Sequence, residues 1–288
     1  MIIVRIAGGL ANRMFQYSYY RHLKSQGKNV YLDDNYRATK WKFEDVDIRK
    51  IFPAIEYEAP SRLQILLHCG GYGTLQKILR HSFLIKNHLV IYDKANSNFE
   101  ELYDIADGKY VIGTLCCEDY FKDISDRIRK DLTFTPFTDE KNISMAQKMS
   151  EESSVAIHIR KGKDYLEKPS TQGTCPVEYY RKAIEYIKEH VENPVFYVFS
   201  DNFEWVDENI SDLDYTRCDW NPVKGWGNHF DMQLQTYCKH NIIANSTYSW
   251  WGAWLGNNKD KIVILPEQWF SDRKATDMRY VPNGWIAM

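Results

Sequence analysis

Cationic side chains follow an apolar run in the second half of the sequence and suggest a site for a phosphate-bearing ligand. The run 155–159 leads directly into Arg160, Lys161 and Lys163. An arginine can hold two phosphate oxygens with its planar guanidinium, and lysines add compact positive charges beside it. A solvated basic turn is the alternative, because exposed charge runs are common. The segment therefore predicts either a diphosphate site or a charged surface turn.

Two further polar clusters favour the first interpretation. Asp201 ends the apolar run 195–200, and its carboxylate could accept paired hydrogen bonds from the N1–H and 2-amino groups of a guanine. Asn245, Ser246 and Thr247 follow a third apolar run and open a helix-like stretch, where they offer an N-cap and backbone N–H groups to an anion. Three such clusters in one half of the chain predict a nucleoside diphosphate site.

Other binding motifs in the sequence are weak. The loop after residues 1–6 contains Gly8, Gly9 and Asn12 but matches neither the dinucleotide fingerprint nor the P-loop. Two D-x-D triplets, at 45–47 and 212–214, could hold a divalent cation on a diphosphate, yet each lies in a polar stretch. We interpret both triplets as surface features and predict no metal site.

Aromatic and cysteine residues point to structure more than to chemistry. Trp251 and Trp254 recur at helical spacing, which is typical of packing against a core. The six cysteines include no C-x-x-C pair, so a zinc site is disfavoured. Reduced thiols are expected, because a chain of this size does not need disulfides to hold its fold.

Strands that alternate with helices must position these clusters. Expected strands cover residues 1–6, 29–33, 110–115, 155–159, 195–200, 241–244 and 262–265; expected helices are two short ones between 63 and 91, then 119–132, 177–190, 231–237 and 247–255. This alternation predicts an α/β fold with parallel, doubly wound sheets, in which ligands bind beyond the carboxyl ends of the strands. The sequence becomes polar at 138–152, so we place a boundary between domains 1–145 and 146–288.

Composition limits the partners and the compartment. The chain has 288 residues, 44% hydrophobic and 26% charged, which suits two folded domains. A net charge of −2 gives no overall positive field for nucleic acid or anionic lipid. The first apolar run is broken too early for a signal peptide, and no run reaches the ~18 apolar residues of a membrane-spanning helix. We therefore expect a soluble protein that binds no nucleic acid.

Four motifs give the chain a family resemblance. They are GGLANRMFQY (8–17), HIRKGKDY (158–165), YVFSDN (197–202) and CKHNIIANSTYSWWGAWL (238–255). With these motifs the chain resembles the bacterial α-1,2-fucosyltransferases of glycosyltransferase family 11 over nearly its whole length. The resemblance implies a GT-B architecture, with two Rossmann-like domains whose parallel sheets face across a cleft. It implies that the N-terminal domain binds mainly the acceptor and the C-terminal domain binds GDP-fucose.

The resemblance also implies the reaction. L-Fucose would move from GDP-fucose to the 2-hydroxyl of a galactoside, with inversion at the anomeric carbon and without a metal or other cofactor. The acceptor would be a galactose-containing oligosaccharide or a lipid-linked glycan. A fucosyltransferase of another linkage, such as α-1,6, and a non-catalytic glycan-binding protein are the alternatives. The expected location is the cytoplasm, with peripheral association with the inner face of the membrane left open.

Catalytic roles fall on the central motif. Positive charge that is already in place stabilises a departing diphosphate mainly in the transition state, and Arg160 is our first choice for that role. A carboxylate would take the proton of the acceptor hydroxyl, with Asp164 as the candidate and Glu167 in reserve. His158 would orient that base or contact the nucleotide. Lys163 looks like an insertion relative to the family motif, which leaves the position of Asp164 open.

Donor-binding roles fall on residues that follow the expected strands. Lys161 and the helix start at 246–247 would assist at the diphosphate, together with Asn245. Asp201 would bind the guanine. Asn12 would reach the phosphate or the fucose from the N-terminal domain, although Ala11 and Arg13 replace the glycine and glutamine usual around it.

Overall fold

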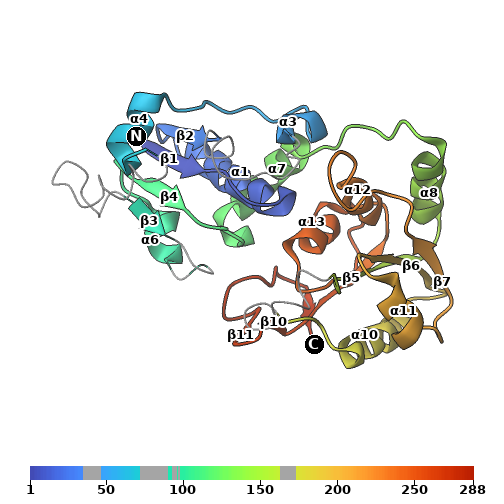
Figure 1. Cartoon of the computed structure of the whole chain (residues 1–288). Coiled ribbons are helices and arrows are strands. Elements are labelled where there is room, and N and C mark those ends of the chain that lie inside the picture. The colour runs from blue at the N-terminus through green and yellow to red at the C-terminus, as the bar shows by residue number, and fades with distance from the viewer. Residues whose placement is uncertain (35–46, 72–89, 93–95, 97, 163–172) are drawn as a thin grey trace. The chain divides into compact units, whose positions relative to one another are not determined.

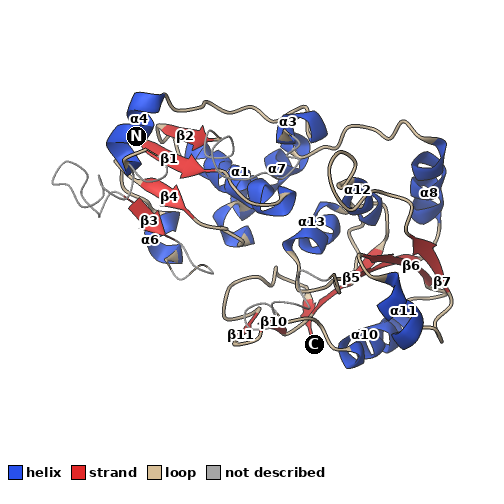
Figure 2. Cartoon of the chain, viewed as in Figure 1, coloured by secondary structure: helices blue, strands red, loops and turns tan. Residues whose placement is uncertain are grey.

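The chain folds into two compact units, residues 1–134 and 135–288. The computed structural model describes residues 1–34, 47–71, 90–92, 96, 98–162 and 173–288. Figure 1 traces these units along the chain, and Figure 2 shows that each contains both helices and strands. Each unit has a parallel sheet of its own, so the predicted α/β class with two parallel sheets is confirmed.

The sheet of the first unit has four parallel strands in the order β2-β1-β4-β3. Their bounds are Ile2–Arg5 for β1, Val30–Asp33 for β2, Val90–Tyr92 for β3 and Tyr110–Ile112 for β4. The central strand β1 is almost wholly buried, as its run of branched aliphatic residues predicts. Tyr17 and Tyr19 of the following helix are buried as well.

The helices in the described residues of the first unit are mostly short. They are α1 (Leu10–Ser25), α3 (Ile48–Ile51), α4 (Arg62–Cys69), α6 (Phe99–Tyr103) and α7 (Ser125–Asp131), with 3-10 turns at Glu118–Tyr120 and Lys122–Ile124. The helix expected at 119–132 is therefore these two turns followed by α7. Of the two helices expected between 63 and 91, α4 is present, and residues 72–89 lie outside the described part of the chain.

The sheet of the second unit has six parallel strands in the order β12-β9-β8-β5-β6-β7. Their bounds are Ser154–Ile159 (β5), Val195–Ser200 (β6), Tyr215–Cys218 (β7), His240–Ile242 (β8), Val263–Leu265 (β9) and Ile286–Ala287 (β12). A separate antiparallel pair joins β10 (Gln268–Phe270) to β11 (Arg273–Lys274). Strand β5 lies between β6 and β8, so the segment that follows it starts from the middle of the sheet.

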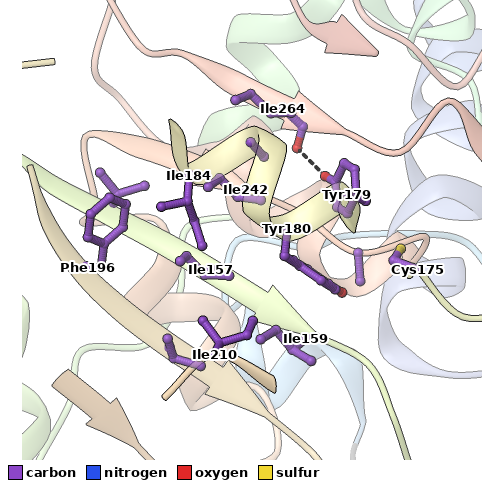
Figure 3. Packing of buried hydrophobic residues seen from close by; sticks show 14 of the residues in the cluster. Ile157, Ile159, Cys175, Tyr179, Tyr180, Ile184, Phe196, Ile210, Ile242 and Ile264 are labelled. Atoms are coloured by element: carbon purple, nitrogen blue, oxygen red, sulfur yellow. Dashed lines mark hydrogen bonds between the residues drawn. The ribbon is translucent and has the colours of Figure 1, made fainter. Parts of the chain in front are cut away.

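Helices cover both faces of this sheet. Their bounds are Glu140–Glu151 (α8), Val177–His190 (α10), Phe203–Asn209 (α11), Phe230–Gln235 (α12) and Thr247–Leu255 (α13). Figure 3 shows Tyr180 and Ile184 of α10 among Ile157 and Ile159 of β5, with Tyr179 reaching the carbonyl of Ile264. Alternate residues of β5 point to the other face, where Ala156 packs in a cluster with residues of α8 and α12.

Helix α8 moves the boundary between the units. The sequence analysis placed the domain boundary between residues 145 and 146. In the structure the second unit begins at residue 135, before α8. Ala146 and Met149 of α8 are buried in the same cluster as Ala156 of β5 and Tyr197 of β6. The polar stretch at 138–152 is therefore an amphipathic surface helix of the second unit and not a linker.

Candidate active site

The carboxyl end of β5 brings Arg160 and Asp201 together. Ile159 pairs with Ser200 in the parallel ladder, so the next residues of the two strands emerge side by side. Arg160 Nη1 lies 2.7 Å from Asp201 Oδ2, and the backbone N–H of Lys161 donates to Asp201 Oδ1 at 2.7 Å. The side chain of Arg160 is 29% exposed and that of Asp201 is 13% exposed. Asp201 therefore fixes the direction of a partly exposed guanidinium.

This arrangement bears on the guanine role predicted for Asp201. Each of its carboxylate oxygens has a partner in the β5 exit, Arg160 for one and Lys161 N–H for the other. A carboxylate oxygen has more than one lone pair, so a further donor can still approach. In the structure Asp201 forms an ion pair with Arg160, and contact with guanine remains a prediction.

Lys161 points into the protein. It is 5% exposed, its Nζ donates to Thr174 Oγ1 at 2.9 Å, and the ammonium lies 4.4 Å from the centroid of the Trp205 ring. Burial lowers the pKa of this lysine. Three cations were predicted to form the diphosphate site. Of these, Arg160 is partly exposed and Lys161 is buried, whereas Lys163 lies outside the described residues.

His158 is a buried neutral imidazole near the same strand end. It is 8% exposed, and its ring centroid lies 5.6 Å from that of Tyr248 in α13. Burial, and secondarily the charge of Arg160, lower the pKa of His158 to about 3. Within the described part of the chain, His158 Nδ1 has no hydrogen-bond partner. Near pH 7 the ring is therefore uncharged, with a hydrogen on one nitrogen and a lone pair on the other, and Nδ1 can exchange a hydrogen bond with a ligand.

The start of α13 is shaped by its own side chains. Ser246 is the N-cap, and its hydroxyl accepts from the backbone N–H of Tyr248 at 3.3 Å, while Thr247 begins the helix and is partly exposed. Asn245 faces inward, and its Nδ2 donates to the carbonyls of Gly173 at 3.1 Å and Trp269 at 2.9 Å. The predicted N-cap is confirmed. The side chain of Asn245 therefore hydrogen-bonds to the backbone of two other chain segments, at Gly173 and Trp269.

Tight packing explains the glycine in the tryptophan-rich stretch. A Cβ atom on Gly252 would lie 2.8 Å from Oε1 and 3.0 Å from Cβ of Gln235, so a larger residue would require Gln235 or the two helices to shift. Trp251 is fully buried and Trp254 is 2% exposed, which confirms that both residues pack in the core. The close contact between the helices sets the position of the α13 start.

Asp231 is a largely buried carboxyl that the sequence analysis did not single out. Its Oδ1 accepts from Asn221 Nδ2 at 2.8 Å, and burial raises its pKa to about 7. The hydroxyl of Tyr248 accepts from the N–H of Met232, and its pKa, raised mainly by burial, responds to the charges of both Asp231 and Arg160. The charges of Asp231 and Arg160 therefore both act on the Tyr248 hydroxyl. Asp231 stands out only because it is buried in the fold, and the sequence around a single aspartate in a polar stretch does not show that burial.

Comparison with known proteins settles the family. The family model described as "Glycosyl transferase family 11" matches residues 1–288. The chain belongs to glycosyltransferase family 11. This glycosyltransferase is 29% identical to an α-1,2-colitosyltransferase of Escherichia coli over 99% of the chain and 98% of that protein. It is 27% identical to human galactoside α-(1,2)-fucosyltransferase 1 over 66% of the chain and 55% of that protein.

Among solved structures, the chain is similar to the NodZ α-1,6-fucosyltransferase soaked with GDP-fucose. The TM-score is 0.48 and the identity 12%, over 88% of this chain and 91% of that one.

Three predicted site residues of this family 11 chain lie in the first unit or outside the described part. Asp164 and Glu167 fall within residues 163–172, which the structure does not describe. Asn12 lies in the first turn of α1, in the first unit, and folds back over the preceding loop. A Cβ atom on Gly8, whose φ is +86°, would lie 3.2 Å from Asn12 Nδ2. Glycine is favoured there by both the backbone angle and the close approach of Asn12.

The described residues also bear on the metal, thiol and membrane features predicted from the sequence. Among the described residues, no group of three or more His, Cys, Asp or Glu side chains is placed to hold a metal ion. Asp212 and Asp214 are exposed, and Asp212 pairs with Arg181, as expected for a surface triplet. All six cysteines are buried thiols. No helix in the described part of the chain is long and apolar enough to cross a membrane.

Proposed function

We propose that this glycosyltransferase moves L-fucose from GDP-fucose to the 2-hydroxyl of a galactoside. The observation that carries the proposal is the guanidinium of Arg160, held by Asp201 at the carboxyl end of the central strand β5. Ligands of doubly wound sheets bind at this edge. Similarity to human galactoside α-(1,2)-fucosyltransferase 1 supports the choice of sugar and linkage.

The charge at Arg160 would act on the leaving group. As the bond between fucose and phosphate breaks, negative charge grows on the GDP oxygens and positive charge grows on the sugar. A guanidinium already oriented by a carboxylate does not have to reorganise at that moment, so it stabilises the transition state more than the bound substrate. The ion pair with Asp201 leaves Arg160 partly exposed, as this role requires.

Two carboxyl groups are candidates for reading the guanine edge. Asp201 already serves Arg160 and the N–H of Lys161, whereas Asp231 has one oxygen engaged by Asn221. In its ionised form, either carboxylate could accept from the N1–H and 2-amino groups of guanine. The buried imidazole of His158 would contact the nucleotide as a neutral ring, because a pKa of about 3 leaves it uncharged near pH 7.

The proton of the acceptor hydroxyl would go to a carboxylate. Asp164 is the proposed base and Glu167 the reserve. Both lie in the segment that follows Arg160 in the sequence. Inversion would follow from attack of the acceptor oxygen on the face of the anomeric carbon opposite the leaving GDP. Fucose would then be joined to the acceptor, and GDP would leave with its diphosphate paired to Arg160.

One comparison supports a second candidate for the transferred sugar. The α-1,2-colitosyltransferase of Escherichia coli matches the chain over nearly its full length, whereas the human fucosyltransferase matches 66% of it. Colitose is therefore the alternative sugar, joined by the same α-1,2 linkage. The proposed roles of Arg160 and Asp231 do not depend on which sugar is transferred.

The decisive experiment is turnover by the purified chain. We expect GDP release from GDP-fucose in the presence of lactose, and linkage analysis of the product should place fucose on the 2-hydroxyl of galactose. A parallel reaction with GDP-colitose compares the donors through kcat/KM. Product with a 6-linkage, or preferred use of GDP-colitose, would replace this assignment. Glycan binding without turnover of either donor would favour the non-catalytic alternative.

A further inference from the structure

The loop between β7 and α12 carries two exposed apolar side chains. Residues 219–229 follow the carboxyl end of β7, and ligands of doubly wound sheets bind beyond the carboxyl ends of their strands. Val223 is 66% exposed and Trp226 is 53% exposed. Tryptophan is largely buried in most folded proteins, so this indole offers a flat aromatic face that is open to a ligand.

The exposed indole is held in place by its own loop. The ring of Trp226 meets the ring of His229 edge-on, with 5.3 Å between centroids, and His229 is 1% exposed. The next residue, Gly227, has a φ of +88°, and a Cβ atom there would lie 2.9 Å from Pro222 Cγ. Glycine is favoured by both the backbone angle and this close approach. An aromatic side chain that is already held loses little freedom when a second ring binds against it.

The same loop contacts residues already considered for the nucleotide. Asn221 Nδ2 donates to Asp231 Oδ1 at 2.8 Å. The carbonyl of Asn228, two residues after the exposed indole, accepts from the hydroxyl of Tyr248 at 2.7 Å. The ring of Tyr248 lies 5.6 Å from that of His158, centroid to centroid. The loop therefore touches Asp231 directly and reaches His158 through one intervening ring.

His158 gives an independent sign of a ligand. The residue is 8% exposed, and no described residue forms a hydrogen bond with its Nδ1. Most buried polar atoms have a hydrogen-bond partner, so a bound molecule is expected to supply one here. A nucleobase has donors and acceptors along its edge and aromatic faces above and below. One such ring could meet both an unpartnered nitrogen and an indole.

We propose that Trp226 provides a stacking face for the purine base of the donor nucleotide. The base would lie on the indole while its edge meets His158. The proposal rests on the proposed function, because that function supplies a guanine nucleotide. Every base has an aromatic face, so stacking adds affinity without reading hydrogen bonds. Trp226 would strengthen binding, and the choice of guanine would be left to the polar residues.

Three substitutions at Trp226 separate stacking from apolar contact. Trp226→Phe keeps an aromatic face, Trp226→Leu keeps an apolar side chain without a ring, and Trp226→Ala removes both. Val223→Ala changes the more exposed apolar side chain of the same loop and is the matched control. Calorimetry on each full-length variant measures the affinities for GDP and GMP. Quenching of tryptophan fluorescence by GDP is recorded in parallel.

We expect Trp226→Ala to weaken GDP binding by about 5- to 100-fold, the scale on which loss of one stacked aromatic ring acts. GMP should weaken by the same factor, because the change concerns the base and not the diphosphate. Trp226→Leu should lose nearly as much. Trp226→Phe should bind GDP within about threefold of wild type, yet its fluorescence should be quenched less, because the stacked indole is gone. Val223→Ala should resemble wild type in both measurements.

Other results would overturn the proposal. Unchanged GDP affinity in Trp226→Ala, with a higher KM for lactose, would place Trp226 at the acceptor. Lys224 lies between the two exposed apolar residues, so binding to phosphatidylglycerol vesicles is measured as well. Loss of vesicle binding with unchanged GDP affinity would make this loop a membrane contact. Failure of the proposed function gives a different signature, because wild type itself would then release no GDP from GDP-fucose, whatever the effect of Trp226→Ala on GDP affinity.

Discussion

Arg160 and Asp201 form an ion pair, 2.7 Å between Nη1 and Oδ2, at the exit of two adjacent parallel strands. The pair depends on register: one residue of slippage between β5 and β6 would separate the two groups. Through Asp201, which follows β6, the ion pair connects the guanidinium of Arg160 to the sheet.

Replacing Arg160 with lysine should lower turnover strongly. Arg160→Lys keeps a positive charge near Asp201 but loses the planar fork that can hold two phosphate oxygens. We expect kcat to fall by about 10²- to 10³-fold, as for loss of one preorganised donor, with little change in the thermal midpoint. Steady-state release of GDP measures the first and circular dichroism the second. Near-normal kcat would remove Arg160 from the leaving-group role.

Replacing Asp201 tests whether it reads guanine as well as positioning Arg160. If it accepts from the base, Asp201→Ala should weaken GDP binding by about 1–3 kcal/mol and narrow the preference for GDP over UDP. If it only holds Arg160, the two nucleotides should weaken by the same factor. Calorimetry with GDP and UDP distinguishes these outcomes, and Asp212→Ala, at an exposed ion-paired aspartate, is the matched control. An unchanged affinity for both nucleotides would place Asp201 outside the site.

Much of the scaffold for this pair could be predicted from the sequence. Helix α10, strand β6 and helix α13 have the bounds expected from periodicity, because each carries a strong apolar pattern. Strand β7 was missed, since its residues are half-exposed at the sheet edge, and α11 was missed because it is short and polar. The inward direction of Lys161 depends on Trp205 and Thr174, contacts that no local pattern contains.

Asp231 and His158 should give opposite pH dependences of stability. Burial raises the pKa of Asp231 from 3.8 to about 7, so between these values the folded protein keeps a proton that the unfolded chain has released. Stability from this group is therefore lost as pH rises from about 4 to about 7. Burial lowers the pKa of His158 from 6.5 to about 3, so its contribution is lost as pH falls through that window.

Two variants separate these contributions. Asp231→Asn should show a free energy of unfolding that rises more steeply with pH between about 4 and 6.5 than wild type, because the opposing carboxyl is gone. His158→Gln should show a shallower rise, or a fall, over the same window. Urea unfolding at several pH values measures both slopes. Parallel curves for wild type and Asp231→Asn would mean that this carboxyl titrates near its ordinary value.

Chelation should leave the reaction nearly unchanged. The proposed neutralisation of the diphosphate uses Arg160 and the N-terminal end of α13, so a divalent cation is not required. Turnover in EDTA should match turnover in buffer. The metal-independent assignment fails if EDTA abolishes activity and Mn²⁺ or Mg²⁺ restores it.

The identity of the base can be decided by two isosteric changes. Asp164→Asn preserves shape and removes basicity, so if Asp164 takes the acceptor proton, kcat should fall by about 10²- to 10⁴-fold with GDP affinity little changed. Lys163 looks like an insertion within the family motif, so a neighbouring carboxylate could take this role instead. Near-normal turnover in Asp164→Asn together with loss in Glu167→Gln would assign the base to Glu167. If both variants stay active, no side-chain base is needed, and catalysis depends on stabilisation of the leaving group by Arg160 and on positioning of the acceptor.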